Sequence, residues 1–362
     1  MANTKRIYVF RSSKVIHIRT QHAPTPSFPL NQESGSEGET SPASSAPLVG
    51  IARLAAESPQ VRERADVEFF ALPARSVLNR QGSGRLPFAW TVNPYRGCEF
   101  GCKYCYARYT HEFMDLRDGL DFERKIYAKT VAPEILRAEL RRTRDQGLPI
   151  ALGTATDPYQ PAEKRFRITR RLLEVFAEFE GISFSITTKS VLILRDLDLL
   201  KVISAKHDFG VHITVTTTNA RLARRLEPKA PPPAQRLATV ARLIDAGIYA
   251  GVNAMPVLPG LTDSHSALNE LARHAAQAGA KFFHGNPLFL MPSAMLQFMP
   301  FLRQEFPQLV RRYERMYARS AYVSQEYRDD LAQTISDLRA RYGLNYPKPE
   351  ISKGAQLTLG YG

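Results

Sequence analysis

The three cysteines constrain this chain more than any other feature. Cys98, Cys102 and Cys105 are the only cysteines in the sequence, and they share one short segment with the spacing C-x3-C-x2-C. An odd number of cysteines placed so close together makes a poor disulfide framework and a good metal site. The sequence therefore predicts a metal centre on a single loop.

Three thiolates on one loop can hold three corners of a cubane [4Fe–4S] cluster, and the fourth iron is then left without a protein ligand. An open coordination position is the arrangement of a catalytic metal site. Gly97 and Gly101 flank the loop, and we expect their lack of a Cβ atom to let the chain wrap closely around the cluster. The alternative is a zinc site made by the three cysteines and His111. That alternative lacks the second paired half-site of structural zinc sites.

Composition divides the chain into three parts. Residues 33–47, ESGSEGETSPASSAP, contain no aliphatic residue larger than alanine and cannot bury enough apolar surface to form a core. We therefore expect residues 1–70 to be a disordered, low-complexity tail and linker. We expect residues 71–290 to form the main domain and residues 291–362 to form a C-terminal helical extension and tail.

Short apolar strands alternate with single amphipathic helices along the main domain. The expected strands are residues 90–93, 150–154, 184–188, 211–216, 249–255 and 281–284. Strands separated by single helices indicate a parallel sheet with right-handed crossovers. Six such units are fewer than the eight of a complete barrel, so the predicted fold is α/β, an incomplete (β/α)6 TIM-like barrel. Helices over residues 295–319 and 325–342 are expected to follow it.

The sequence predicts neither export nor a membrane span. The N-terminal residues are interrupted by Lys and Arg every few positions, so they lack the apolar core of a signal peptide. The longest uncharged stretch, Phe282 to Leu302, contains Pro287, Pro292 and Pro300. We interpret it as a buried strand followed by loops and the start of a helix. A cytoplasmic location is the resulting expectation.

The segment NPYRGCEFGCKYCYAR, with an aromatic residue before its last cysteine, resembles the signature of radical S-adenosylmethionine (SAM) enzymes. Together with GTATDPYQPAE and ITTKS further along the chain, it resembles the spore photoproduct lyase-like branch of that superfamily. The resemblance implies a barrel with a [4Fe–4S] cluster held by Cys98, Cys102 and Cys105, whose open iron binds SAM. It also implies cleavage of SAM, hydrogen abstraction from a substrate in a lyase- or transferase-type reaction, and an external one-electron donor such as flavodoxin or ferredoxin.

The resemblance also implies which residues contact SAM. Thr156 and Asp157 follow the second strand, where this branch has a Ser/Thr–Asp pair near SAM. Lys189 follows the third strand and resembles the family's partner for the SAM carboxylate. Thr216 ends the fourth strand and is expected to offer a hydroxyl to the ribose. Tyr104 is expected to lean on the cluster–adenine region. Simpler roles remain open, since Asp157 before a proline can form an Asx turn and a lysine at a strand end is often solvated.

Tyr106 is the expected catalytic residue. Spore photoproduct lyases resemble this loop with tyrosines at both positions matching Tyr104 and Tyr106, and these relay a hydrogen atom together with a cysteine. That cysteine is expected near the end of the second strand, where this chain has Gly153-Thr154-Ala155-Thr156. Its absence argues against photoproduct lyase activity itself. The cysteine count also excludes an auxiliary cluster with cysteine ligands and any mechanism that uses a second reactive cysteine.

Basic residues give the chain a formal net charge of +14, which favours a polyanionic partner. Three groups of basic residues stand out: residues 164–171, residues 221–229 and residues 311–319. If they share a face with the barrel mouth, they can follow a phosphate backbone; otherwise they are solvated helix faces that include Glu174, Glu227 and Glu314. Three hypotheses remain open: hydrogen abstraction from a base of DNA or RNA, the same chemistry on a small molecule or protein, and a zinc-stabilised nucleic-acid-binding protein without catalysis.

Overall fold

Within the residues that the structure describes (48–64, 66–81, 86–143 and 149–345), the main sheet of this computed structural model has seven strands. Their order is β11-β10-β9-β8-β7-β4-β3; β3 pairs antiparallel with β4, and the other neighbours pair parallel. The bounds are β3 (Asn79–Arg80), β4 (Trp90–Val92), β7 (Ile150–Leu152), β8 (Ser183–Thr188), β9 (Asp208–Thr214), β10 (Ala250–Val257) and β11 (Phe283–Pro287). Each of the six expected strands is therefore present, with ends shifted by a few residues.

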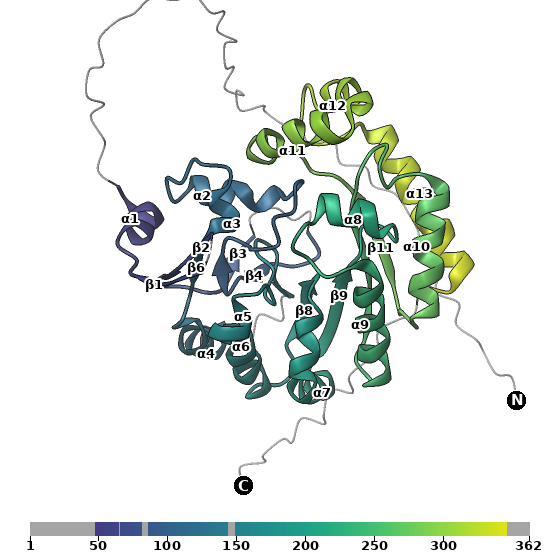
Figure 1. Cartoon of the computed structure of the whole chain (residues 1–362). Helices are drawn as coiled ribbons and strands as arrows, with labels where there is room; N and C mark the ends of the chain where they lie inside the picture. Colours follow the sequence, from purple (N-terminus) through teal and green to yellow (C-terminus); the bar gives the residue numbers. More distant parts are fainter. Residues whose placement is uncertain (1–47, 65, 82–85, 144–148, 346–362) are drawn as a thin grey trace, which may run out of the picture. The chain divides into compact units, whose positions relative to one another are not determined.

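Helices follow the parallel strands along the chain and flank the sheet (Figure 1). They are α4 (Ala132–Thr143), α5 (Glu163–Phe166), α6 (Ile168–Ala177), η2 (Val191–Asp196), α7 (Leu197–Lys206), α8 (Ala220–Leu226), α9 (Pro233–Asp245) and α10 (His265–Gln277). In the described part of the chain the sheet ends at β11 on one side and β3 on the other, so the barrel is open. The predicted fold class, an α/β fold with an incomplete (β/α)6 barrel, is confirmed.

The two faces of the sheet differ in polarity. One face packs on the helices through buried apolar residues, and Phe184 of β8 stacks on Phe176 of α6 with ring centroids 4.2 Å apart. The other face carries polar side chains, among them Ser185, His212 and Asn253. Parallel sheets with helices on both sides are apolar on both faces. This sheet therefore keeps a polar face for contacts other than helix packing.

The predicted tail to residue 70 extends too far. Residues before 48 lie outside the described part of the chain, but α1 (Gly50–Ala56), β1 (Gln60–Arg64) and β2 (Val67–Ala71) are formed. They belong to a second sheet, in the order β1-β2-β6-β5, with β5 (Tyr95–Arg96) and β6 (Lys125–Ala128). The side chains of Val67 and Phe69, which alternate along β2, are buried against the main core. The polar composition of the preceding segment does not predict this burial. Its strand β5 ends at Arg96, two residues before Cys98, so this sheet anchors the cysteine loop.

The expected helix over residues 295–319 is divided. The structure has α11 (Pro292–Glu305), η3 (Pro307–Leu309) and α12 (Val310–Met316), whereas α13 (Gln325–Tyr342) has the expected bounds. The break falls at Phe306, with φ −146° and ψ 56°, because the residue before a proline is forced out of the α-helical conformation. The uncharged stretch is β11, a loop and the start of α11, as expected. Among the described residues, no helix is long and apolar enough to cross a membrane.

Candidate active site

The cysteine loop lies between β5 and η1 (Tyr106–Arg108), and it follows β4 at the carboxyl edge of the main sheet. Neighbouring backbone fixes it: the amide of Cys98 donates to the Phe122 carbonyl at 2.8 Å, and the amide of Lys103 donates to the Leu226 carbonyl at 2.9 Å. The thiols of Cys98 and Cys102 are buried, that of Cys105 is half-buried, and all three are free. The loop thus presents three thiols from a rigid support.

Gly97 is required for a reason other than the one expected from the sequence. It has φ +82°, and a Cβ atom there would meet the Lys125 and Phe122 carbonyl oxygens at 2.8 and 2.9 Å. The missing side chain therefore allows the loop to pack on α3 (Asp121–Arg124) and β6, and it does not face the sulfurs. At Gly101 a Cβ atom would have ordinary contacts, so its φ of +63° is what favours glycine.

The turn after β7 holds the cysteine loop from the other side. The Thr156 hydroxyl donates to the Gly97 carbonyl at 2.7 Å. Gln160 donates to the same carbonyl at 3.0 Å and accepts from the Glu99 amide at 3.0 Å. Sequence reasoning missed Gln160, although it lies inside the quoted motif DPYQPAE. The side chains of both Thr156 and Gln160 therefore bind the cysteine loop and hold it in position.

Asp157 joins the end of β7 to the end of β8. Its Oδ1 accepts from the Tyr159 amide at 2.9 Å, which is the Asx turn considered above, and from the Thr188 hydroxyl at 2.6 Å. Its Oδ2 accepts from the backbone amide of Lys189 at 2.7 Å. Burial raises the pKa of Asp157, whereas these hydrogen bonds lower it, and the effect of burial is the larger of the two. The carboxyl group thereby fixes the backbone position from which the Lys189 side chain extends.

The Lys189 ammonium lies over the Tyr104 ring, with Nζ 5.8 Å from its centroid. It has no ion-pair partner within 4.0 Å among the described residues. Burial lowers the pKa of Lys189, but the nearby Cys102 and Glu227 raise it further, so the net shift is upward. The side chain therefore remains a half-buried cation beside the cysteine loop, able to receive an anionic group.

A buried ion pair, Glu227–Arg236, lies close enough to Lys189 to affect its pKa. Their side chains are 2.5 Å apart and almost fully excluded from solvent. Tyr104 donates its hydroxyl to Glu227, and Thr216 donates to it at 3.1 Å. The expectation that Glu227 belongs to a solvated helix face is wrong. The Thr216 hydroxyl, expected at the ribose, is hydrogen-bonded to this carboxylate.

The cysteines lie in an environment that disfavours free thiolates. Burial raises the pKa of Cys102 to about 12 even though Lys189 lowers it, and burial also raises the pKa values of Cys98 and Cys105. Thiols with such pKa values are largely inert as nucleophiles at neutral pH, whereas a bound metal ion displaces their protons. The set of donors therefore fits a metal cluster better than a thiol nucleophile.

The structure does not support a zinc site with His111. Among the described residues, no three His, Cys, Asp or Glu side chains are close enough to hold a single metal ion. His111 is buried instead, with Nε2 3.1 Å from the Lys125 carbonyl and its ring against Phe122. Burial lowers the pKa of His111 to about 4, so it is neutral at pH 7. Its role is to pack the helix after the loop.

Tyr106 lies at the outer end of the loop and is 39 % exposed. Its hydroxyl donates to the Thr154 carbonyl, within the turn where the relay cysteine of photoproduct lyases is expected. Its ring is 6.3 Å from that of Phe289, which follows β11. The Tyr106 side chain is therefore exposed at the carboxyl edge of the sheet.

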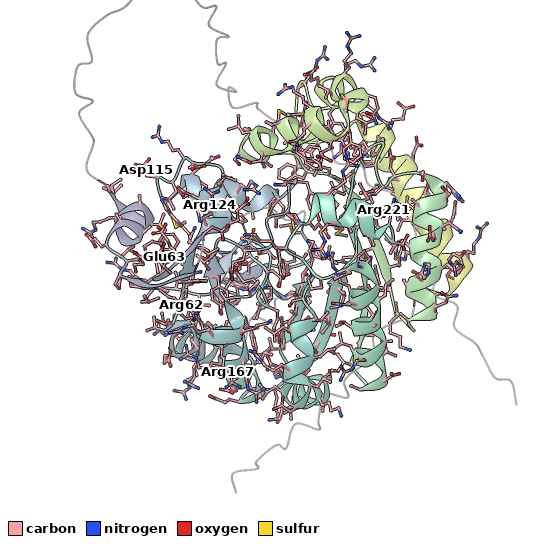
Figure 2. All side chains as sticks on the ribbon, in the orientation of Figure 1. Arg62, Glu63, Asp115, Arg124, Arg167 and Arg221 are labelled. Atoms are coloured by element: carbon pink, nitrogen blue, oxygen red, sulfur yellow. The ribbon has the colours of Figure 1, made fainter. Side chains whose placement is uncertain are left out.

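The first two basic groups do not form one surface. Arg170 pairs with aspartates of η2 and α7, and Arg225 pairs with Glu305. Figure 2 shows Arg167 and Arg221, one from each group, well apart on the molecule. In these two groups, the arginines with acidic partners stabilise the fold.

The third group divides in two. Arg312 pairs with Asp263 at 3.3 Å, between α12 and the turn before α10. Arg315 and Arg319 are exposed and have no hydrogen-bond or ion-pair partner in the part of the chain that the structure describes. Their charges are available to a ligand.

Comparisons with known proteins agree with this geometry. Residues 92–272 match the model of the radical SAM superfamily. A protein of Mycobacterium tuberculosis (strain H37Rv) is 36% identical over 81% of this chain and 87% of its own length, and one of Methanocaldococcus jannaschii is 26% identical over 74% and 93%. The fold is similar to that of spore photoproduct lyase in complex with a dinucleoside spore photoproduct (TM-score 0.54, 13% identity, 77% of this chain and 80% of that chain).

Proposed function

The chain belongs to the radical SAM superfamily, and we propose that Cys98, Cys102 and Cys105 hold its [4Fe–4S] cluster and leave one iron open to SAM. Enzymes of this superfamily use such a cluster together with SAM. The observation that carries the proposal is the set of three free, largely buried thiols on one loop at the carboxyl edge of the sheet. When bound by these three cysteines, the cluster together with SAM would supply a carbon-centred radical for hydrogen abstraction.

Lys189 is the residue proposed to bind the carboxylate of SAM. Its ammonium is charged, half-buried and without an ion-pair partner among the described residues, beside Cys102 and over the Tyr104 ring. A cation held in a partly desolvated place binds an anion more strongly than one in water. Tyr104 is proposed to lie against the adenosine portion of SAM, with its ring fixed by the hydrogen bond to Glu227.

Thr156, Asp157 and Thr216 are proposed to act as positioning residues. Their hydroxyl and carboxyl groups already bind Gly97, Lys189 and Glu227 respectively. Through these partners they fix the cysteine loop, the Lys189 backbone and the support of Tyr104. A catalytic geometry depends on such supporting contacts because small displacements of the reacting groups are costly.

Tyr106 is proposed as the catalytic side chain that touches the substrate. It is exposed, next in sequence to Cys105, and held by the Thr154 carbonyl. The turn that bears Thr154 has no cysteine, so the thiyl relay of spore photoproduct lyase is unavailable to this chain. The reaction is therefore proposed to be a different hydrogen abstraction from photoproduct repair.

The proposed substrate is a base of DNA or RNA. The net charge of +14 favours a polyanion, and the polar face of the sheet carries His212 and Asn253, whose side chains lie within 3.3 Å of each other. A base taken out of its stack presents donors and acceptors along one edge, and enzymes read it by hydrogen bonds and aromatic contacts. Tyr106 and Phe289 supply the aromatic contacts at the same edge of the sheet.

Isotope transfer tests this proposal. The reduced, cluster-loaded protein is incubated without oxygen with SAM and with DNA or RNA whose bases and sugars are deuterated. We expect 5′-deoxyadenosine that carries deuterium, because the radical takes its hydrogen atom from the nucleic acid. Unlabelled nucleic acid is the control and should give unlabelled product. Undeuterated 5′-deoxyadenosine from both DNA and RNA would move the substrate to a small molecule or a protein.

A further inference from the structure

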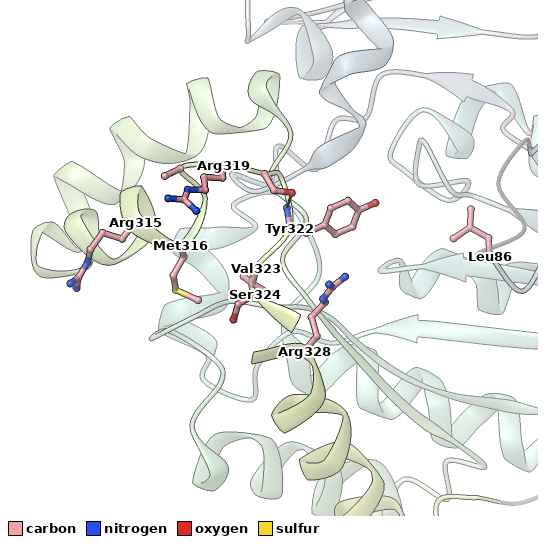
Figure 3. A pocket seen from close by; sticks show the side chains of 10 residues that line it. Leu86, Arg315, Met316, Arg319, Tyr322, Val323, Ser324 and Arg328 are labelled. Atoms are coloured by element: carbon pink, nitrogen blue, oxygen red, sulfur yellow. Dashed lines mark hydrogen bonds between the residues drawn. The ribbon is translucent and has the colours of Figure 1, made fainter. Parts of the chain in front are cut away.

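A cavity of about 710 Å³ lies between the end of α12 and the start of α13 (Figure 3). Three arginines line it together with an exposed tyrosine, and its wall contains no acidic side chain among the described residues. Ser324, the N-cap of α13, also borders it. The Ser324 hydroxyl accepts from the Tyr327 amide and Glu326 lies in the first turn of this helix, so the positive charge of the cavity comes from the arginines.

The arginines of the cavity differ from most of those in the predicted basic groups. Arg315 and Arg319 have no partner among the described residues. Arg328 donates to Gln325 at 2.6 Å, its Nε is buried without a hydrogen bond, and its guanidinium lies 5.9 Å from the centre of the Tyr322 ring. Charges that the fold does not neutralise are the ones a phosphate can bind.

The cavity is connected to the active site by aromatic rings. Tyr322 is 49% exposed, and its ring centroid lies 4.5 Å from that of Phe289. Phe289 lies 6.3 Å from Tyr106, the residue after Cys105. In Figure 3, Tyr322 and Arg328 point together toward Leu86 and Arg319 lies on the α12 side, whereas the Arg315 side chain extends away from Tyr322. Positive charge and stackable rings thus lead from the C-terminal helices to the cysteine loop.

We propose that this cavity binds the phosphodiester backbone of a single nucleic-acid strand, with Tyr322 stacked on a base beside the one that reacts. This inference rests on the proposed nucleic-acid substrate and adds where the strand lies. Grooves that bind single strands combine a positively charged track for the backbone with aromatic side chains for the bases. The cavity contains both, whereas a site for one small anion has no need of the exposed ring.

Binding of a fluorescein-labelled single-stranded DNA of about 20 nucleotides, longer than one typical binding site, tests the proposal by anisotropy over a range of salt concentrations. The variant Arg315→Ala/Arg319→Ala should bind about tenfold more weakly and lower the slope of log K against log salt by about 1.4, since each lost phosphate contact removes about 0.7. Tyr322→Leu should weaken binding about fivefold or more and leave the slope unchanged, because stacking releases no counterions.

The matched control is Arg141→Ala/Arg142→Ala, which removes two exposed charges from α4 and should keep wild-type affinity and slope. Thermal unfolding checks that each variant is folded. Wild-type binding by the Arg315/Arg319 variant, or an equal loss in the control, overturns the proposal and leaves the proposed function intact. A wild type that binds a mononucleotide as tightly as the strand overturns it too. A wild type that binds no strand at low salt removes both the cavity proposal and the nucleic-acid substrate, while 5′-deoxyadenosine measured in parallel reports the radical chemistry separately.

Discussion

Replacing Arg236 by alanine is expected to lower the free energy of unfolding by about 3–5 kcal/mol, because it leaves a buried carboxylate without its counter-charge. Glu227 and Arg236 are both about 1% exposed, and the arginine also donates to the Pro231 and Thr214 carbonyls. Denaturant unfolding of the cluster-loaded protein under anaerobic conditions measures the change. A loss below about 1 kcal/mol would mean that the pair is not desolvated as described.

Two further variants separate the ion pair from general damage to the helix. Arg242→Ala removes an exposed arginine of the same helix, α9, and is expected to change stability by no more than about 0.5 kcal/mol. Glu227→Leu/Arg236→Leu removes both charges and should cost less than Arg236→Ala alone, since no unpaired charge remains. A double variant that loses as much stability as Glu227→Leu and Arg236→Leu lose in sum would contradict the coupling.

The second large effect is expected at Cys102. In Cys102→Ala, iron should fall well below about four per chain, the content of a complete cubane. Formation of 5′-deoxyadenosine should fall by more than about a hundredfold. Loss of a residue that only hydrogen-bonds to a metal ligand already lowers metal affinity or activity by about 10–100-fold, and Cys102 is proposed to be a ligand itself. Iron analysis and product chromatography measure both quantities. Lys103→Ala, in the same loop, is the control and should retain iron and activity; iron retained by Cys102→Ala would exclude this thiol as a ligand.

The sequence predictions that are confirmed depend on patterns among residues close together in the chain. Strands appear where apolar residues of strand length lie between helices, and the order of strands follows because parallel neighbours need crossover helices. The end of the first C-terminal helix was missed at Phe306–Pro307, where a proline signal was present and not used. The cysteine loop was visible because its three thiols are adjacent in sequence. Its assignment as the cluster-binding loop stays a prediction.

Contacts between distant residues could not be predicted. Tyr104 donates a hydrogen bond to Glu227, which lies more than a hundred residues further along the chain. No sequence periodicity predicts that a single glutamate at the end of a helix is buried. Gln160 and Gly97 meet for the same reason, through the packing of one loop on another. The second sheet was missed because strand pairing is non-local, although the alternation at Val67 and Phe69 was a usable signal.

We propose that Cys98, Cys102 and Cys105 hold a [4Fe–4S] cluster with one iron available to SAM, and every other proposed residue role depends on this cluster. Electron paramagnetic resonance of the reconstituted protein after reduction, recorded with and without SAM, tests it most directly. We expect the signal of a reduced [4Fe–4S] cluster that changes when SAM is added, because SAM binds the iron that no side chain occupies. A signal that is identical with and without SAM, or a colourless protein that contains zinc, would contradict the claim.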